Sequence, residues 1–371
     1  FFTLSMSRFD PRNSGAPSIL RYSSMNGTAK MGFGVFCITL WFIFFYLSIT
    51  LEEQIHFFGI PVLKVLQQYR SPRLNKLSKF IEITGFEIWV ILIPSMLWSG
   101  VRLIQRSALR CFLLFSYALY VQSLLKAYFR EPRPAAIDDT LMPIGRHTMK
   151  EYSYPSGHSY AVCVIVFTFA SAMEEYWKNY TAVRGFHWKR VLFYLLAIAY
   201  GACTVFTRIY AAVHFPHDII AGCIAGFTIL LFYENFTIGL MGHTAMVIVM
   251  LCANMLVINM DFIGEEFKQD GLFVVPAYLA GMILVEIISN GYAPLWKLRF
   301  SWKWVVIRSL LGISATIGMF VVLFRLVDQF WQMVTFCLLI PLLFFHLVPM
   351  VLCKIQGGEC VQGHKKADKD D

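Results

Sequence analysis

The sequence predicts an all-α polytopic membrane protein, with a six-helix core followed by about four additional C-terminal transmembrane helices. Two observations predict this class. First, 57% of the 371 residues are hydrophobic and only 15% are charged, and the mean hydropathy is +0.59, beyond an ordinary globular domain. Second, apolar runs of about 20 residues, the length that crosses roughly 30 Å of hydrocarbon, recur along the chain.

Ten apolar segments are long enough to be spans. They lie near residues 31–51, 86–104, 108–126, 157–175, 190–207, 214–233, 240–260, 271–290, 304–327 and 330–353. Residues 54–82 are amphipathic and mixed in charge, which predicts a helix lying in the membrane interface. We therefore expect four parts, namely an N-terminal segment over 1–30, the six-helix core over 31–233, C-terminal helices over 234–353 and a charged tail over 354–371.

The Lys and Arg residues sit mostly in short loops between these segments, where they orient the helices. Their distribution predicts that both termini are cytoplasmic. The net charge of +9 is thereby accounted for, so we expect no nucleic-acid binding. Residues 1–30 are polar and basic without a compact apolar core, so we expect no cleavable signal peptide. The nine cysteines fall mostly in apolar runs without paired spacing, which favours neither a disulfide framework nor a zinc site.

Three polar stretches interrupt this apolar chain at the ends of predicted helices. They are Lys126-Ala-Tyr-Phe-Arg-Glu-Pro-Arg133-Pro134, Pro155-Ser156-Gly157-His158 and Arg208-Ile-Tyr-Ala-Ala-Val-His214-Phe-Pro-His-Asp218. Each alone is an ordinary turn or interfacial anchor, but the alternation of the spans brings all of them to one face of the membrane. By the charge bias, this face is lumenal or exterior.

These residue types suit phosphoryl transfer. Lys126, Arg133 and Arg208 are fixed cations for phosphate oxygens, and the Ser156 hydroxyl and the Gly157 amide are added donors. Glycine also allows the backbone to approach a ligand closely.

Two histidines fit a two-step mechanism at a helix mouth. Pro216 is expected at the first helical position, which places His214 at the mouth and Asp218 about one turn into the helix, where free amides favour phosphate. We assign His214 as nucleophile, His158 as general acid and base, and Asp218 as the carboxylate that orients His214. The scheme requires no metal and no cofactor.

The three stretches resemble the signature of the type 2 phosphatidic acid phosphatase (PAP2) superfamily, whose usual forms are K-x6-RP, PSGH and SR-x5-H-x3-D. The match is complete except that Thr207 replaces the usual serine. The resemblance covers roughly residues 31–233. It implies metal-independent hydrolysis through a phosphohistidine intermediate.

Within that superfamily the chain is similar to the sphingosine 1-phosphate phosphatase branch. The interval from Pro134 to Pro155 is compact and ends in Glu151-Tyr-Ser-Tyr-Pro-Ser156, although Gly157 stands where the branch often has threonine. The resemblance implies a lipid substrate, a sphingoid base 1-phosphate, and a lumenal site in the endoplasmic reticulum membrane.

Two other readings remain open at this point. A member of the same superfamily can act on a polyprenyl diphosphate or glucose 6-phosphate, and a membrane scaffold or transporter can retain a vestigial site. Four further polar residues have simpler explanations in the sequence. His217 reads as a helix cap, His243 as interfacial and Glu131 as a solvated loop charge, and His56 has no evident partner.

Overall fold

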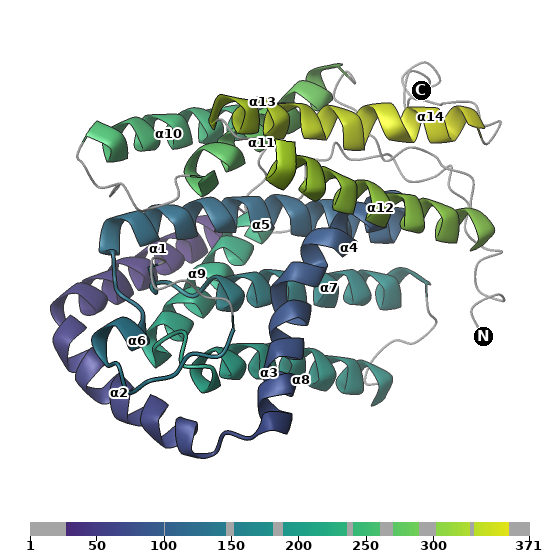
Figure 1. Cartoon of the computed structure of the whole chain (residues 1–371). Coiled ribbons are helices and arrows are strands. Elements are labelled where there is room, and N and C mark those ends of the chain that lie inside the picture. Colours follow the sequence, from purple (N-terminus) through teal and green to yellow (C-terminus); the bar gives the residue numbers. More distant parts are fainter. Residues whose placement is uncertain are drawn as a thin grey trace.

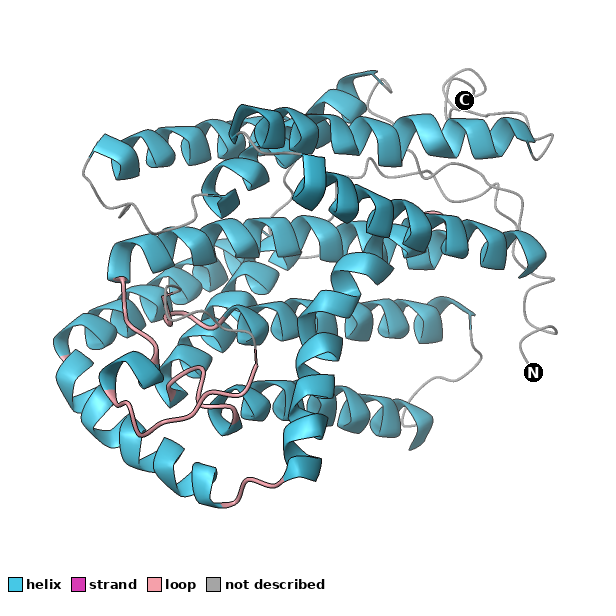
Figure 2. Cartoon of the chain, in the orientation of Figure 1, coloured by secondary structure: helices cyan, strands magenta, loops and turns pink. Residues whose placement is uncertain are grey.

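A computed structural model describes residues 27–99, 101–145, 152–180, 188–235, 240–259, 270–288, 302–326 and 330–355. Within these ranges the chain forms helices and loops and contains no strand (Figure 2). The predicted all-α class is confirmed. Most of the predicted N-terminal segment and C-terminal tail lies outside the described residues.

A helix lies at each of the ten predicted positions. The helices are α1 (Gly27–Thr50), α4 (Ile88–Leu97), α5 (Arg102–Phe129), α7 (Gly157–Tyr180), α8 (Trp188–Tyr210), α9 (Pro216–Asn235), α10 (Leu240–Asn259), α11 (Asp270–Ile288), α12 (Trp302–Leu326) and the run formed by α13 (Phe330–Pro341), η3 (Leu342–Leu347) and α14 (Val348–Ile355).

By length and composition, four helices in the described ranges can cross a membrane. They span Pro72–Leu97, Leu103–Ile137, Trp188–Tyr210 and Gln332–Leu352. Shorter apolar helices cover Gly157–Met173, Pro216–Leu230, Met241–Leu256 and Leu272–Val285. The chain is thus built from membrane-compatible helices, and the count of ten spans stays a prediction.

The region between the first two predicted spans differs from the expectation. Instead of one interfacial helix over 54–82, the chain forms α2 (Glu52–Gln68) and then α3 (Pro72–Glu82). Ser71 caps α3 by accepting a hydrogen bond from the Leu74 amide, and Pro72 occupies the first turn. The predicted boundary at residue 86 was wrong because the charged residues of α3 lower the local hydropathy, although the helix itself continues.

That continuation runs from α3 through a π-helical turn, η2 (Ile83–Glu87), into α4. The π turn lies against α8, where the Tyr200 hydroxyl donates to the Thr84 carbonyl oxygen at 2.6 Å. A Cβ added to Gly85 would lie 2.5 Å from Thr204 Cγ2, so glycine is needed for this close approach. The long helix is therefore fixed against α8 at its turn.

Helix α5 runs through the middle of the molecule. In Figure 1 it lies between α10 and α13 above and α7 and α8 below, and it packs against α7 and α11. A polar contact joins it to α10, where the Tyr120 hydroxyl donates to the Met250 carbonyl oxygen at 2.8 Å. Helix α10 is joined in turn to α11, because Asn254 Nδ2 donates to the Leu272 carbonyl oxygen at 2.7 Å. One apolar core cluster includes residues from α4, α5, α7, α9, α10, α11 and η3.

Two glycines let α9 approach α7 closely. A Cβ added to Gly222 would lie 2.5 Å from the Ser156 carbonyl oxygen, and one added to Gly226 would lie 2.8 Å from the Tyr160 carbonyl oxygen. Small residues four apart are a common device for close helix packing in membranes. The contact places the start of α7 beside the first turns of α9.

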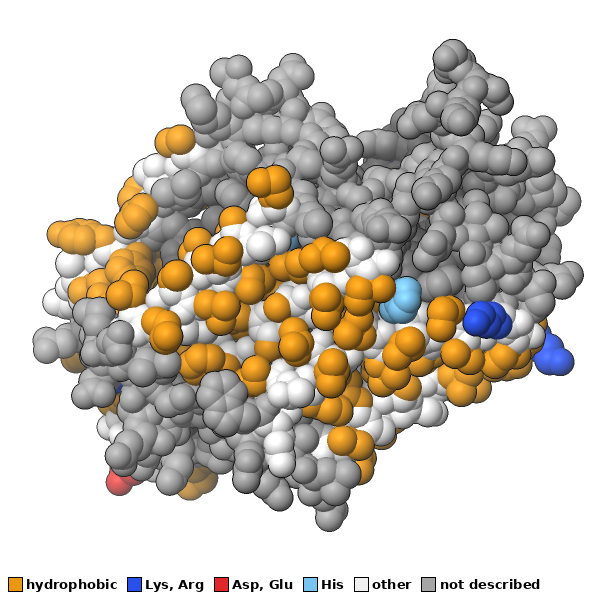
Figure 3. Space-filling model, turned by 90° about the horizontal axis from the view of Figure 1, so that it is seen from above, with side chains coloured by type: hydrophobic (Ala, Val, Ile, Leu, Met, Phe, Trp, Pro, Cys, Tyr) orange, Lys and Arg blue, Asp and Glu red, His pale blue; other side chains and the backbone are white. Residues whose placement is uncertain are grey.

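The described surface is strongly apolar. Seen from above, hydrophobic side chains are spread over the described part of that face, and few charged or His side chains appear there (Figure 3). The exposed residues of the uppermost helices include Ile248, Met255, Leu339, Leu343 and Val351. A wide apolar exterior is the surface expected of a protein surrounded by lipid.

Candidate active site

The three motif stretches meet at the ends of four helices. Lys126 lies in the last turn of α5 and Arg208 in the last turn of α8, whereas His158 is the second residue of α7 and His214 comes two residues before α9. Arg133 is the N-cap of the short helix α6 (Pro134–Ile137). The structure therefore brings the motif residues into one region, beside α2 and α6 in Figure 1.

The turn after α5 positions the first motif. Arg130 adopts a left-handed conformation with φ of 52°, and its amide donates to the Lys126 carbonyl oxygen at 3.1 Å. This closes the helix and reverses the chain, as in other left-handed C-caps. Lys126 and Arg133 therefore lie on either side of a tight turn.

His214 is oriented by Asp218 from within α9. Its Nδ1 lies 3.2 Å from Asp218 Oδ2, and the same carboxylate oxygen accepts from the Phe215 amide at 2.9 Å and from the Ser153 hydroxyl. His214 is 3% exposed and Asp218 is fully buried. The contact at Nδ1 leaves Nε2 as the ring nitrogen that can face a ligand.

The surroundings keep the His214 imidazole neutral. Burial is the main cause that holds the pKa of His214 well below its ordinary value, and the positive charges of Arg133, Arg208 and Lys126 lower this pKa further. A neutral ring retains the lone pair that a nucleophile needs. His158 contributes to the same lowering, so it also lies within electrostatic range of His214.

Each cation is held by an oxygen on a neighbouring segment. Lys126 Nζ donates to the Tyr152 carbonyl oxygen at 2.9 Å, and Arg133 donates to the Val213 carbonyl oxygen at 2.8 Å. Arg208 pairs with Glu82 of α3 at 3.1 Å and is fully buried. All three cations also lie close enough to His214 to lower its pKa, and such a group of cations around one imidazole favours an anionic ligand.

Ser156 and Gly157 lie at the join between α7 and α9. The Ser156 amide donates to the Asp218 carbonyl oxygen at 3.1 Å, and its hydroxyl accepts from Ser159 at 3.1 Å. A Cβ added to Gly157 would lie 2.5 Å from Gln122 Nε2 of α5. Gly157 thus packs against the end of the flexible Gln122 side chain, and the role of this glycine toward a ligand stays a prediction.

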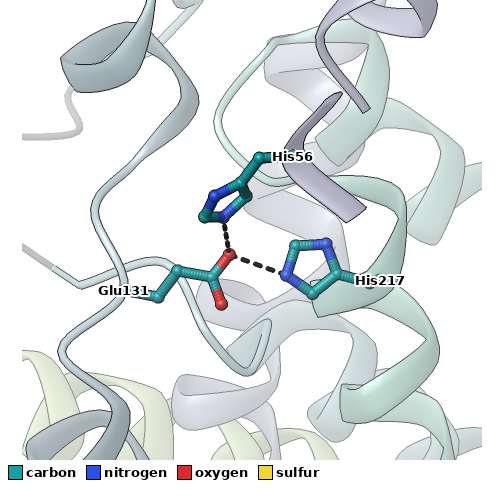
Figure 4. Close-up of side chains that lie close together, drawn as sticks. All are labelled: His56, Glu131 and His217. Atoms are coloured by element: carbon teal, nitrogen blue, oxygen red, sulfur yellow. Dashed lines mark hydrogen bonds and ion pairs between the residues drawn. The ribbon is translucent and has the colours of Figure 1, made fainter. Parts of the chain in front are cut away.

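Several residues near the site were not found from the sequence. Glu131 is only 5% exposed and not a solvated charge, because His56 Nε2 and His217 Nε2 lie 2.7 Å and 2.6 Å from its Oε1 (Figure 4). His217 is the second residue of α9 and also lies 3.2 Å from Asp218 Oδ1. The one sequence signal for Glu131 was its position inside the first motif. Its partners could not be predicted, because they depend on where α2 packs.

Two further expectations are corrected by the structure, and two residues join the site without having been predicted. His56 has a partner after all, and Glu82 of α3 and Ser153 are the residues that the sequence did not assign to the site. His243 is buried against Tyr117, at 2% exposure, and is not interfacial. Among the described residues, His56, Glu131 and His217 form a group whose ligand atoms lie within 4.8 Å of one another and could hold a metal ion.

Comparison with known families agrees with this arrangement. Residues 109–238 match the PAP2 superfamily. The chain contains a PAP2 superfamily domain. This PAP2 domain extends from α5 to just beyond α9 and includes all three motif stretches, from Lys126 to Asp218.

Curated relatives of the PAP2 domain include two phosphatases. The chain is 26% identical over 161 residues to dihydrosphingosine 1-phosphate phosphatase YSR3 of Saccharomyces cerevisiae, which covers 43% of this chain and 38% of the relative. It is 25% identical over 173 residues to a probable sphingosine-1-phosphate phosphatase of Dictyostelium discoideum, which covers 46% of this chain and 41% of the relative. The matched segment thus spans about two fifths of the length of these relatives.

A solved structure with a PAP2 fold is also similar. It is the transmembrane PAP2 type phosphatidylglycerolphosphate phosphatase from Bacillus subtilis, with a TM-score of 0.43 and 19% sequence identity. The similarity covers 53% of this chain and 94% of the bacterial one.

Proposed function

We propose that this protein is a membrane-embedded lipid phosphate phosphatase that hydrolyses a sphingoid base 1-phosphate through a phosphohistidine on His214. One observation carries the proposal. A buried neutral histidine, oriented by Asp218 at a helix start, lies among three fixed cations inside a PAP2 domain. This is the arrangement that in-line attack on a phosphate monoester requires.

The reaction proceeds in two steps. In the first, His214 Nε2 attacks phosphorus, the bond from phosphorus to the ester oxygen breaks, and His158 gives its proton to the leaving alkoxide. In the second, His158 accepts a proton from water, the resulting hydroxide attacks phosphorus, and the bond from phosphorus to His214 breaks to release inorganic phosphate. Asp218 stabilises the positive charge on His214 as the N–P bond forms.

The cations bind the phosphate throughout both steps. Lys126, Arg133 and Arg208 neutralise the equatorial oxygens, and the Ser156 hydroxyl and the Gly157 amide add hydrogen bonds. No metal ion takes part in this scheme, since the charge that a metal would neutralise is met by side chains.

A small apolar crevice beside the site favours a lipid over a soluble sugar phosphate. It is lined by side chains of α1, α5 and α9, including Phe44, Leu125 and Ile224. Pro155, which directly precedes Ser156, also lines it. An acyl or sphingoid chain that lies against this apolar lining would have its phosphate beside the motifs. The printed names of the two curated relatives favour the sphingoid class.

We extend the proposal to organisation and location. The unit over 31–233 carries catalysis, the helices over 234–353 support it, and both termini face the cytoplasm. The site then faces the lumen, with the endoplasmic reticulum as the organelle, in line with the basic bias of the opposite loops.

A substrate panel tests the proposal. Full-length protein in detergent is offered dihydrosphingosine 1-phosphate, phosphatidic acid, a polyprenyl diphosphate and glucose 6-phosphate, in the presence of EDTA. We expect phosphate release from the sphingoid phosphate at the highest kcat/KM. Release from glucose 6-phosphate alone would remove the lipid assignment, and no release from any substrate would favour a scaffold.

A trapping experiment tests the mechanism separately. With substrate labelled at phosphorus, wild-type protein quenched in alkali should carry acid-labile phosphate. His158→Ala lacks both the acid of the first step and the base of the second, so its label should form and decay more slowly than in the wild type, whereas His214→Ala should carry none. Label that persists in His214→Ala would exclude His214 as nucleophile.

A further inference from the structure

A second polar cluster lies next to the proposed catalytic residues and takes no part in the scheme above. It joins three separate segments, namely His56 of α2, Glu131 of the turn after α5, and His217 of α9 (Figure 4). Both imidazole Nε2 atoms lie against the same carboxylate oxygen, at 2.7 Å and 2.6 Å. His56 and Glu131 are 75 positions apart in the sequence, and Glu131 and His217 are 86 positions apart. The fold nevertheless brings their side chains together at one carboxylate oxygen.

The donor set is that of a divalent cation of the zinc class. Two imidazole nitrogens and one carboxylate oxygen are ligands that zinc takes at about 2.0–2.2 Å, with a fourth position left for water. Ligands on a tetrahedral ion stand roughly 3.3 Å apart, a spacing that follows from those bond lengths. The two measured separations are therefore within about 1 Å of it, and all three ligand atoms already lie within 4.8 Å of one another.

The rings are held in place by aromatic neighbours. Phe215 packs against His56 and His217 with ring centroids 4.8 Å and 5.5 Å away, and Tyr154 stacks on His217 at 5.8 Å. Phe215 itself is fully buried. Ring orientation is what second-shell residues supply in metal sites, so binding would need little rearrangement.

The burial and the charge of the cluster also favour a cation site. The side chains of His56, Glu131 and His217 are 17%, 6% and 11% exposed, so the cluster is covered but open to a small ion. In the metal-free arrangement both rings must carry a proton on Nε2 to donate to Glu131. A divalent cation would take both nitrogen lone pairs and the carboxylate charge at once.

We propose that His56, Glu131 and His217 form a binding site for a zinc-class divalent cation that fastens α2 to α9. The site is distinct from the phosphoryl-transfer residues and its existence does not depend on phosphatase activity. It does touch them, since His217 Nε2 also lies 3.2 Å from Asp218 Oδ1. Metal binding would redirect that nitrogen from Asp218 to the ion.

Zinc titration of the full chain in detergent, after removal of metal by a chelator, tests the proposal. We expect one saturable site per chain in competition with a chromophoric chelator, and a zinc-dependent rise in Tm. Glu131→Gln keeps the shape of the side chain but removes its charge, and it should weaken binding at least ~10-fold, the minimum seen even for residues that only support ligands. His346→Ala, a histidine outside both clusters, should bind as the wild type does.

The ligands around zinc bound to the wild-type protein test the proposed site even if a variant fails to fold. X-ray absorption at the zinc edge should show two imidazoles and further oxygen ligands without sulfur. A sulfur shell would assign the zinc to some of the nine cysteines and overturn the proposal. Absence of saturable binding, or equal affinity in Glu131→Gln, would equally overturn it and leave the cluster as a hydrogen-bonded clamp.

Discussion

The proposed phosphate site and the contact between α5 and the C-terminal helices both bury polar side chains, but with different partners. At the contact with the C-terminal helices, neutral side chains bond to one another, as with Tyr120 of α5 and Asn254 of α10 at 2.9 Å. At the proposed site, Lys126, Arg133 and Arg208 all lie close enough to His214 to lower its pKa. Buried polarity alone therefore does not indicate a site, whereas several charges that act on one titratable group favour one.

The largest difference is expected when the variant Asp218→Asn is compared with the variant Tyr117→Phe. Each substitution keeps the shape of the side chain and removes one polar feature from a histidine contact. Asp218→Asn should lower kcat on the order of 10³–10⁴-fold, because His214 loses its orienting charge. Tyr117→Phe should retain activity but lower the free energy of unfolding by about 1–3 kcal/mol, since it leaves His243 buried without that hydroxyl. Steady-state kinetics and chemical unfolding measure the two effects, and similar kinetic losses in both variants would break the contrast.

A buried arginine in each region gives the next test. Arg133, at 4% exposure, belongs to the proposed phosphate site, whereas Arg308 of α12 is fully buried and donates to the Ser99 carbonyl oxygen at 2.8 Å. Arg133→Gln should lower kcat/KM by roughly 10²–10³-fold because one transition-state donor is lost. Arg308→Gln should change Tm and leave kcat/KM within about threefold, far below the effect of a lost donor. A large kinetic loss in Arg308→Gln would show that the C-terminal helices shape the site.

Close-packed glycines allow a milder comparison. A Cβ at Gly222 would lie 2.5 Å from the Ser156 carbonyl oxygen, and one at Gly281 of α11 would lie 2.3 Å from the Leu338 carbonyl oxygen of α13. Both Gly222→Ala and Gly281→Ala should destabilise the protein by about 1–3 kcal/mol through overpacking. Only Gly222→Ala should also lower kcat, since it displaces the start of α7. Gly318→Ala, with nothing within 4 Å of the new Cβ, is the matched control and should not lower Tm.

The smallest expected effect concerns pH. Because the pKa of His214 is lowered, its imidazole stays neutral as the pH falls through the ordinary value of about 6.5 and is protonated only below it. The acid limb of kcat/KM that belongs to His214 should therefore lie below 6.5. Arg133→Gln removes one of the lowering charges and should move this limb to higher pH. Substrate ionisation is the same in both proteins, so the difference in profile reports the enzyme, and an unmoved limb would argue against this assignment.

The sequence was most informative where chemistry is concentrated in short motifs. It predicted the all-α class, a helix at each apolar segment, and Pro216 as the first residue of the helix that carries Asp218. These features depend on local composition and on proline geometry. The sequence also placed the motif cations at helix ends, which the structure brings together.

What sequence reasoning missed depends on packing between distant segments. Glu131, His56 and His217 meet only because α2 folds over the starts of α6 and α9, and no spacing within one segment encodes that contact. Glu82 reaches Arg208 for a similar reason, from a helix whose charged first half was expected to lie in the interface. Mean hydropathy is averaged over a window of residues, so a single charged residue in an apolar stretch does not reveal which distant segment it contacts.

The π-helical turn in the long α3–α4 helix has a consequence for the spacing of residues along the gene. Its i→i+5 hydrogen bonds hold one residue more per turn than the i→i+4 bonds of an α-helix, so a one-residue deletion within Ile83–Glu87 can be absorbed as a plain α-helical turn. Glu82 comes directly before the turn and pairs with Arg208. A one-residue insertion is not absorbed in this way. It would rotate Glu82 by about 100° relative to α4 and away from Arg208 while leaving every motif letter intact, so an inactive relative can arise with a perfect signature.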